Sequence, residues 1–567
     1  MDTVRRLYLY AMSAVSLAVL AVGAQALLTV ALHGLGLRGV PVFGGDPGDR
    51  QALSLAIALV GVGLPVWAIH WWLVERSVRR GADAEAERRA GIRAFYLSAV
   101  LAVFILVAAI AAMSLVRIVV SRLMPLSDDY YGYEDLAGTI STLFVVAAGW
   151  ALHAQTRRVD VAGGELHGGA AWLPRLYRYV VTFFGLVIFA QGLGEIAKVA
   201  IVYVSGTSSP DAIYGGGYAY QLRQALPAAI VGLAAWVSHA WASDRVAASD
   251  GWHGASEQTS RIRLGYWPLV IAVAAFASII ALAGGLGAVL GQVLGTSADV
   301  SPSLAVQIAA AAAAAVPWLA IWWLHGRWGR DAASATGDPG RRTFAARLDR
   351  HVGAAVGLAF GAIATGWLVG VLIDVVLGGS RTVGDGWRHE LSQFLAWAVL
   401  GLPLWIWNWS RLLALRQADP AGEASSAVRR AYLLLAIGVA IVSTLGSLAI
   451  VLYRLVGYLL GAGLGGNAVS ELSTPLGALI AAAAIVVYHG LQLRSDGELR
   501  PATADAAEAA APVAAPLTAA VPPAAMAAED TAARISLELR GPTGADLEAT
   551  LAMLRGVLPE GQTLAEG

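Results

Sequence analysis

The stretch that decides the fold reads Gly63-Leu64-Pro65-Val66-Trp67-Ala68-Ile69-His70-Trp71-Trp72. It ends an apolar run and is followed by charged residues, among them Glu75, Arg76 and Arg79. Related endings occur five more times along the chain, with the proline, the tryptophan or the histidine replaced in some copies. They hold Trp150 and His153, Trp236 and His239, Trp322, Trp405 and Asn408, and finally His489. A pattern that returns in this way indicates an internal repeat.

The copies recur at a nearly constant distance. His70 and His153 are 83 residues apart, and His153 and His239 are 86 apart, so alternate copies lie 169 residues apart. This period predicts a two-helix hairpin as the unit and a four-helix block used three times. An even number of helices in a block keeps every copy in the same orientation in a membrane, unlike the inverted repeats of many transporters.

Composition indicates a membrane protein. Hydrophobic residues make up 57% of the chain and charged residues 14%. A soluble protein needs a more polar exterior than this composition supplies. Apolar runs long enough to cross a bilayer must be helices, because lipid offers backbone amides no other partner. We expect spans at about 8–32, 51–74, 95–120, 135–155, 177–204, 220–242, 266–294, 303–325, 351–377, 390–413, 431–460 and 474–493.

The predicted fold class is therefore an all-α polytopic membrane protein with twelve transmembrane helices in six hairpins. The predicted membrane repeats are 1–160, 161–335 and 336–497. Residues 498–533 are rich in alanine and proline, which predicts a disordered linker. Residues 534–567 alternate and then show a helical apolar face, which predicts a small strand–helix unit.

The signatures also resemble a known family. Arg-x-x-Tyr opens one helix, and Gly-Leu-Pro-x-Trp-x-x-His-Trp ends the next. The residues that carry the resemblance are Arg5, Tyr8, Pro65, Trp67, His70 and Trp71. They are similar to an uncharacterised bacterial family of multi-pass membrane domains of unknown function, built from four-helix units. The resemblance covers about residues 1–495 as three tandem units. It implies a fold and a membrane location, and it carries over no catalytic residue.

The distribution of basic residues predicts the orientation. Segments on the Trp-x-x-His side hold 27 Lys and Arg residues, whereas the opposite loops and adjoining helix ends hold nine. By the positive-inside rule, both termini are expected in the cytoplasm, with the chain in the cell membrane. The first span has the look of a signal peptide. Its Arg5-x-x-Tyr8 matches copies that open internal helices, so we expect a retained helix.

Several functional classes are disfavoured. There is no cysteine, which excludes disulfides, thiolate catalysis and iron–sulfur clusters. The formal net charge is zero, which gives no basic field for nucleic acid. We find no phosphate-binding loop, metalloprotease helix or serine elbow. The chain is thus expected to be neither an enzyme nor a cofactor protein, and its expected partner is the lipid bilayer.

The Trp-x-x-His endings admit two interpretations. Imidazoles at matching depth, such as His70, His153, His239 and His489, could ligate haem or a metal. Alternatively, tryptophan and histidine form an interfacial belt with apolar bodies in lipid and polar tips at the head groups. The belt is favoured because Trp322 and Asn408 occupy the histidine position in two copies.

One asymmetric polar face is the candidate site. Gln191, Glu195 and Lys198 are spaced so that they share one face of the fifth span, and Lys198 is the only lysine in the chain. Ionisable groups inside a membrane are functional candidates. A lysine near a helix end can instead extend outward to the interface. The loop 128–135, with four acidic residues and three tyrosines, could collect a cation, but an interfacial tyrosine belt accounts for it.

Three functions follow as hypotheses. The first is a scaffold or sensor that couples the membrane bundle to a cytoplasmic partner, or to another copy, through residues 534–567. The second is a transporter or channel for a small solute, with its path at Gln191, Glu195 and Lys198. The third is a membrane haem protein, which a missing Soret absorbance would exclude.

Overall fold

The computed structural model describes residues 3–37, 49–80, 84–124, 136–162, 168–206, 217–296, 303–335, 337, 339–378, 386–460 and 467–499. Contacts divide the chain into two parts, Met1–Asp505 and Ala506–Gly567. The expected strand–helix unit at 534–567, nearly all of the linker at 498–533 and the loop 128–135 lie outside the described residues. The predictions made for them therefore stay predictions.

Every element in these described ranges is an α-helix, and twelve of the helices are long and apolar enough to cross a membrane. These are α1 (Thr3–Gly34), α2 (Asp49–Arg80), α4 (Gly91–Leu123), α5 (Leu136–Ala162), α6 (Gly169–Val204), α7 (Gly217–Ala247), α9 (Arg261–Val293), α10 (Leu304–Ala335), α11 (Pro339–Val376), α12 (Gly386–Ala418), α14 (Ala427–Leu459) and α15 (Ala468–Glu498). The predicted all-α fold with twelve spans is confirmed. The chain is a multi-pass membrane protein.

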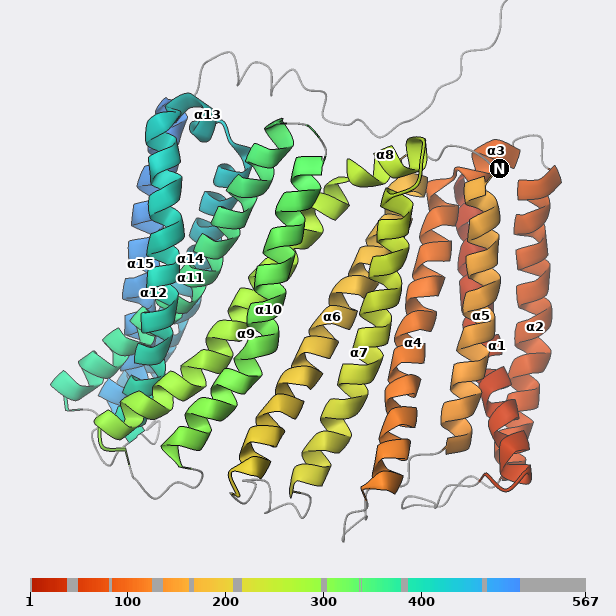
Figure 1. The fold of residues 1–567 in the computed structure, drawn as a ribbon, viewed down its shortest axis with the longest axis horizontal. Helices are drawn as coiled ribbons and strands as arrows, with labels where there is room; N and C mark the ends of the chain where they lie inside the picture. The colour runs from red at the N-terminus through yellow and green to blue at the C-terminus, as the bar shows by residue number, and fades with distance from the viewer. Residues whose placement is uncertain are drawn as a thin grey trace, which may run out of the picture. The chain divides into compact units, whose positions relative to one another are not determined.

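Three short helices join the hairpins. They are α3 (Ala84–Arg88), α8 (Trp252–Gln258) and α13 (Pro420–Ala424). All three lie at the end of the bundle where α1 begins, which is the upper end in Figure 1. We call this the arginine-rich end, because the segments there carry most of the arginines. The sequence analysis did not predict these helices, since they are too short and too polar to show as apolar runs.

The long helices form three repeats. Repeat 1 is α1, α2, α4 and α5; repeat 2 is α6, α7, α9 and α10; repeat 3 is α11, α12, α14 and α15. Within each repeat the first two helices pack as a hairpin, and so do the last two, while the first helix also contacts the fourth. The third helices of repeats 1 and 2 contact the first hairpin of the following repeat, so that α4 packs on α6 and α7, and α9 on α11 and α12.

Glycines bring helices close together at these contacts. A Cβ placed on Gly357 of α11 would lie 2.4 Å from the backbone nitrogen of Trp405 in α12. One placed on Gly370 would lie 3.0 Å from the carbonyl oxygen of Ser473 in α15. At Gly357 only glycine permits such an approach, and at Gly370 a larger residue would press on the neighbouring backbone. Close backbone packing of this kind contributes to helix association in lipid, where the hydrophobic effect between helices is missing. The Gly-x-x-x-Gly spacing in α11 marks these contacts in the sequence.

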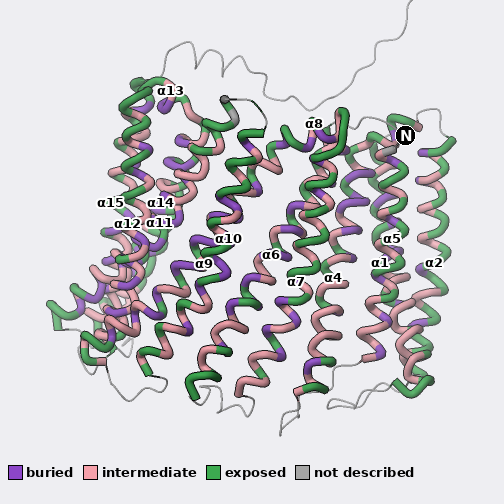
Figure 2. The backbone as a smooth tube through the Cα atoms, in the orientation of Figure 1, coloured by how far each residue is buried: buried purple, intermediate pink, exposed green. Residues whose placement is uncertain are grey.

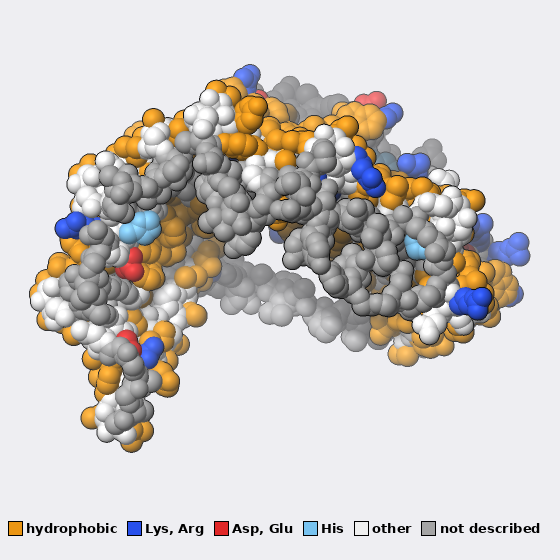
Figure 3. Space-filling view, turned by 90° about the horizontal axis from the view of Figure 1, so that it is seen from below, with side chains coloured by type: hydrophobic (Ala, Val, Ile, Leu, Met, Phe, Trp, Pro, Cys, Tyr) orange, Lys and Arg blue, Asp and Glu red, His pale blue; other side chains and the backbone are white. Residues whose placement is uncertain are grey.

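Buried residues are interspersed along the long helices, coloured purple in Figure 2, and exposed positions recur between them. Many exposed side chains are large and apolar, as expected for helices that face lipid. Viewed from below in Figure 3, most of the coloured side chains are hydrophobic and few are charged.

Candidate functional site

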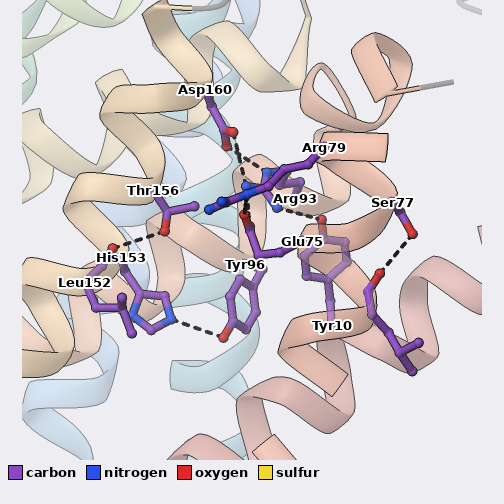
Figure 4. Close-up of polar contacts among 11 residues, drawn as sticks. Tyr10, Glu75, Ser77, Arg79, Arg93, Tyr96, Leu152, His153, Thr156 and Asp160 are labelled. Carbon is purple, nitrogen blue, oxygen red and sulfur yellow. Dashed lines mark hydrogen bonds and ion pairs between the residues drawn. The ribbon is translucent and has the colours of Figure 1, made fainter. Parts of the chain in front are cut away.

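A buried arginine organises the arginine-rich end of repeat 1. Arg93, near the start of α4, is only 1% exposed. Its Nε donates to Oδ2 of Asp160 in α5 at 2.7 Å, and its Nη2 donates to Oε1 of Glu75 in α2 at 2.8 Å. Its Nη1 lies 3.5 Å from the hydroxyl of Tyr10 in α1. Figure 4 shows these side chains converging from all four long helices of the repeat.

The same arrangement recurs with different partners. In repeat 2, Arg263 donates to Asp244 at 3.1 Å and to the hydroxyl of Tyr179 at 3.2 Å. In repeat 3, Arg429 is 1% exposed and donates to Asp496 at 2.6 Å. Arg263 is half-buried and Asp244 is 64% exposed, so the pair in repeat 2 is open to its surroundings. The arginines of repeats 1 and 3 are buried, and buried charges are tolerated only when they are paired and hydrogen-bonded, as these two are. In each repeat, the arginine joins the third helix to one or more other helices of that repeat.

A second ion pair accompanies each cluster and holds the short helix in place. The carboxylates of Glu87, Glu257 and Glu423, on α3, α8 and α13, are all nearly fully buried. Each stands six residues before the arginine near the start of the third helix of its repeat: Arg93, Arg263 or Arg429. Their partners are on the first helix of the same repeat: Arg6 at 2.6 Å, Arg175 at 3.0 Å and Arg347 at 2.5 Å. The spacing Glu-x5-Arg-x-x-Tyr, readable in the sequence, would have marked these glutamates as part of the repeat, but not their partners.

Four histidines of the repeated endings meet tyrosines near the start of other helices. The hydroxyl of Tyr96 lies 3.2 Å from Nε2 of His153, as Figure 4 shows. Equivalent pairs join Tyr8 to His70 at 3.4 Å, Tyr177 to His239 at 3.3 Å and Tyr432 to His489 at 3.4 Å. In each histidine Nδ1 faces the carbonyl oxygen four residues earlier in its own helix. Both ring nitrogens thus have protein partners.

The endings lie at different degrees of burial. His153 and His489 are buried between helices, whereas His70 and His239 are half-buried. Trp67, Trp150, Trp236, Trp322, Trp405 and Asn408 are half-buried as well. Trp71 and Trp409 pack against the Tyr–His pairs of repeats 1 and 3. The interfacial belt stays a prediction, and the contacts add a packing role for these residues.

One histidine escaped the sequence analysis. His325 follows Trp322 by three residues, the same Trp-x-x-His spacing, but it stands one turn later in its helix than the other copies. It is 1% exposed and packs against Tyr266 and Trp267 of α9 and Trp236 of α7. The copy at α10 therefore has its histidine after all, shifted along the helix. Among the described residues, no group of three or more His, Asp or Glu side chains is placed to hold a metal.

The candidate polar face lines a cavity in repeat 2. Gln191, Glu195 and Lys198 of α6 lie along one wall of a cavity of about 760 Å³ between α6, α9 and α10. The Nζ of Lys198 is paired with the Glu195 carboxylate, and Nε2 of Gln191 lies 3.4 Å from Glu195 Oε1. The Glu195 and Lys198 side chains are 35% and 39% exposed, so the pair faces the cavity without being sealed.

The rest of this cavity is mostly apolar. Phe276 and Ile280 of α9 form one side, and Ala311, Ala314 and neighbouring residues of α10 form another. Gln221 of α7 and Gln307 of α10 add two further amides to the lining. The sequence brought the three α6 residues together on one face, but it did not show the opposing walls, because those belong to other helices.

Repeat 1 has a cavity at the corresponding place. It measures about 560 Å³ and lies between α1, α4 and α5. Gln25 and Thr142 are the polar residues among its lining, and no charged side chain contributes. In both repeats the first, third and fourth helices line this space. The ion pair is therefore a feature of the repeat 2 cavity and not of the shared architecture.

Comparison with known proteins identifies the repeated unit. A model of a domain of unknown function, DUF5671, matches residues 6–126, 175–320 and 347–484. The three matches begin at the arginines that pair with α3, α8 and α13. The searches of curated proteins and of solved structures returned no match. With three tandem matches over more than half of its length, the chain belongs to the DUF5671 family of domains of unknown function.

Proposed function

We propose that the protein is a membrane sensor that binds a small amphipathic molecule in the cavity of repeat 2. The observation that carries the proposal is the cavity itself, with the Glu195–Lys198 pair set in apolar walls. Its volume falls in the usual range for small-molecule sites, which are apolar with a few polar groups that orient the ligand.

The lining specifies a class of ligand. A carboxylate, an ammonium and three amides are gathered on α6 and its neighbours, while aromatic and aliphatic side chains form the remaining wall. A zwitterionic head group satisfies both members of the ion pair, and a hydrocarbon chain fills the apolar part. A single-chain lipid with a zwitterionic head group has both features.

The packing of repeat 2 favours binding over passage. Between the cavity and the arginine-rich end, its helices are filled by a buried cluster. The cluster contains Tyr179, Leu186, Ala190, Tyr266, Val270, Ala274, Trp318 and Ile321. A solute moving from the cavity to that end would have to displace these side chains. This supports a sensor over the alternative, a transporter or channel that uses the same polar face.

Binding to purified protein tests the proposal. With a radiolabelled single-chain phosphocholine lipid as probe, we expect Glu195→Gln and Lys198→Met each to weaken binding at least tenfold, about 1.4 kcal/mol. Glu471→Gln is the matched control, because Glu471 pairs with Arg454 in repeat 3, at 3.3 Å. Unchanged affinity in both cavity variants would refute the site. Probe flux across sealed vesicles that is lost in the same variants would favour the transporter.

We also propose that the sensor lies in the cell membrane with both termini in the cytoplasm, where residues 534–567 meet a protein partner or another copy. The excess of arginine at one end supports this orientation. Protease added to inside-out vesicles should remove the tail, whereas right-side-out vesicles should protect it. Deleting residues 500–567 should remove crosslinked partners, and an unchanged set of partners would contradict the coupling role.

A further inference from the structure

The repeats leave two helix faces without a neighbour. The third helices α4 and α9 pack on the next repeat, but α14, the third helix of repeat 3, has no later repeat among the described residues. In the same way α7 and α12 are covered by α4 and α9, whereas α2 is covered by no equivalent helix in the part of the chain that the structure describes. The two ends of the array therefore present complementary halves of a contact that the chain itself makes twice.

The open face of α14 carries apolar residues at the same positions as the covered face of α9. Ala275 and Ile279 of α9, which stand 12 and 16 residues after Arg263, are 2% and 5% exposed because α11 and α12 cover them. The same counts on α14 give Ile441 and Leu445, which are 44% and 61% exposed. The open helix thus carries apolar residues at the positions that α9 buries.

The same comparison among the second helices shows that α2 is exposed where α7 and α12 are covered. Nine residues before the aligned tryptophan, Pro227 of α7 and Ala396 of α12 are buried, but Ala58 of α2 is exposed. Five residues before it, Leu400 of α12 packs in the cluster with α9, whereas Val62 of α2 is 63% exposed. At these positions α2 carries apolar residues similar in size to those of α12, but no helix covers them as α9 covers α12.

The two internal contacts between repeats, α4 with α7 and α9 with α12, also include polar and close-packed residues. Arg223 of α7 donates to the carbonyl oxygen of Met124 at 2.6 Å, past the last residue of α4. In the second contact, a Cβ on Gly287 of α9 would lie 2.5 Å from the side-chain nitrogen of Gln393 in α12. The position of Arg223 is Ser54 in α2, and the position of Gly287 is Tyr453 in α14, so a contact between copies would depend on the apolar positions.

We propose that α14 of one chain docks on α2 of a second copy, continuing the array head to tail. The repeats have their arginine-rich ends on one side, so two copies inserted the same way present these faces to each other without rotation across the membrane. Such a contact joins two different surfaces. It is heterologous and builds a ring if it closes or a chain if it does not.

Paired cysteines test the contact directly, because the natural chain contains none. Val62 is at the position of Leu400, and Leu445 is at the position of Ile279. Leu400 and Ile279 pack in one cluster, so we choose Val62→Cys and Leu445→Cys. Oxidation of membranes that carry the double variant should give a ladder of dimer and higher species. Co-expression of the two single variants should give a dimer and no larger species.

The controls separate docking from collision. Ile230→Cys on α7 is one residue from the position that corresponds to Val62 and is 51% exposed. Paired with Leu445→Cys, it should give no ladder. Efficient dimer formation by Leu445→Cys alone would show an α14–α14 contact and overturn the proposal. An inserted double variant that stays monomeric would overturn it as well.

Discussion

Replacing Arg93 with alanine is expected to destabilise the protein by about 3–5 kcal/mol, the usual cost of removing one partner from a buried ion pair. The substitution leaves Asp160 and Glu75 charged and without their shared donor at the arginine-rich end of repeat 1. The melting temperature of detergent-purified protein should fall sharply. Arg79→Ala is the matched control, because Arg79 pairs with the same Glu75 but is 75% exposed. It should change little.

A compensating variant separates charge from packing. Arg93→Met with Asp160→Leu removes both members of the closest pair and fills the space with apolar side chains. Well-packed apolar replacements of a buried pair are often neutral or stabilising, so the double variant should regain part of the loss even though Glu75 remains. A wild-type melting temperature for Arg93→Ala would show that the cluster contributes little to stability.

Gly477→Ala is the second substitution that we expect to reduce stability strongly. A Cβ at this position in α15 would lie 2.1 Å from the carbonyl oxygen of Gly366 and 2.6 Å from the nitrogen of Gly370, both in α11. The clashing atoms belong to the backbone, which cannot change rotamer as a side chain can. The added Cβ therefore forces α11 and α15 apart. We expect a loss of about 1–3 kcal/mol, the typical cost of overpacking. Denaturation of purified protein measures it.

Gly490→Ala provides the comparison on the same helix. A Cβ at Gly490 has no atom within 4 Å outside its own helix, so the change adds only helix propensity. The protein should keep or slightly gain stability. If Gly477→Ala and Gly490→Ala behaved alike, the close α11–α15 approach would not contribute to stability.

The spans were predictable because each depends on a local property. Backbone groups in lipid must bond within their own helix, so a long apolar run fixes the element wherever its neighbours lie. The period of the Trp-x-x-His endings added the number of repeats. Helical spacing alone was enough to place Gln191, Glu195 and Lys198 on one face of α6.

Other features depended on residues distant in sequence. The Glu-x5-Arg-x-x-Tyr spacing marks Glu87 as part of the repeat, but its partner Arg6 stands 81 residues earlier, so only the tertiary structure shows the ion pair. His325 was missed because it is displaced by one turn from the aligned copies, and only the surrounding aromatic side chains show its equivalence. The cavity at Glu195 needed the walls of α9 and α10.

The sequence by itself determined the class of protein, the twelve spans, the three repeats and the single asymmetric polar face, because hydrophobic length and periodicity are properties of one helix at a time. Tertiary structure alone decided which charges are buried and paired, which tyrosine meets which histidine, and that Gln191, Glu195 and Lys198 face a cavity. Those outcomes depend on contacts between helices. The free energy of such a contact depends on residues from both helices, so the sequence of one helix does not determine it.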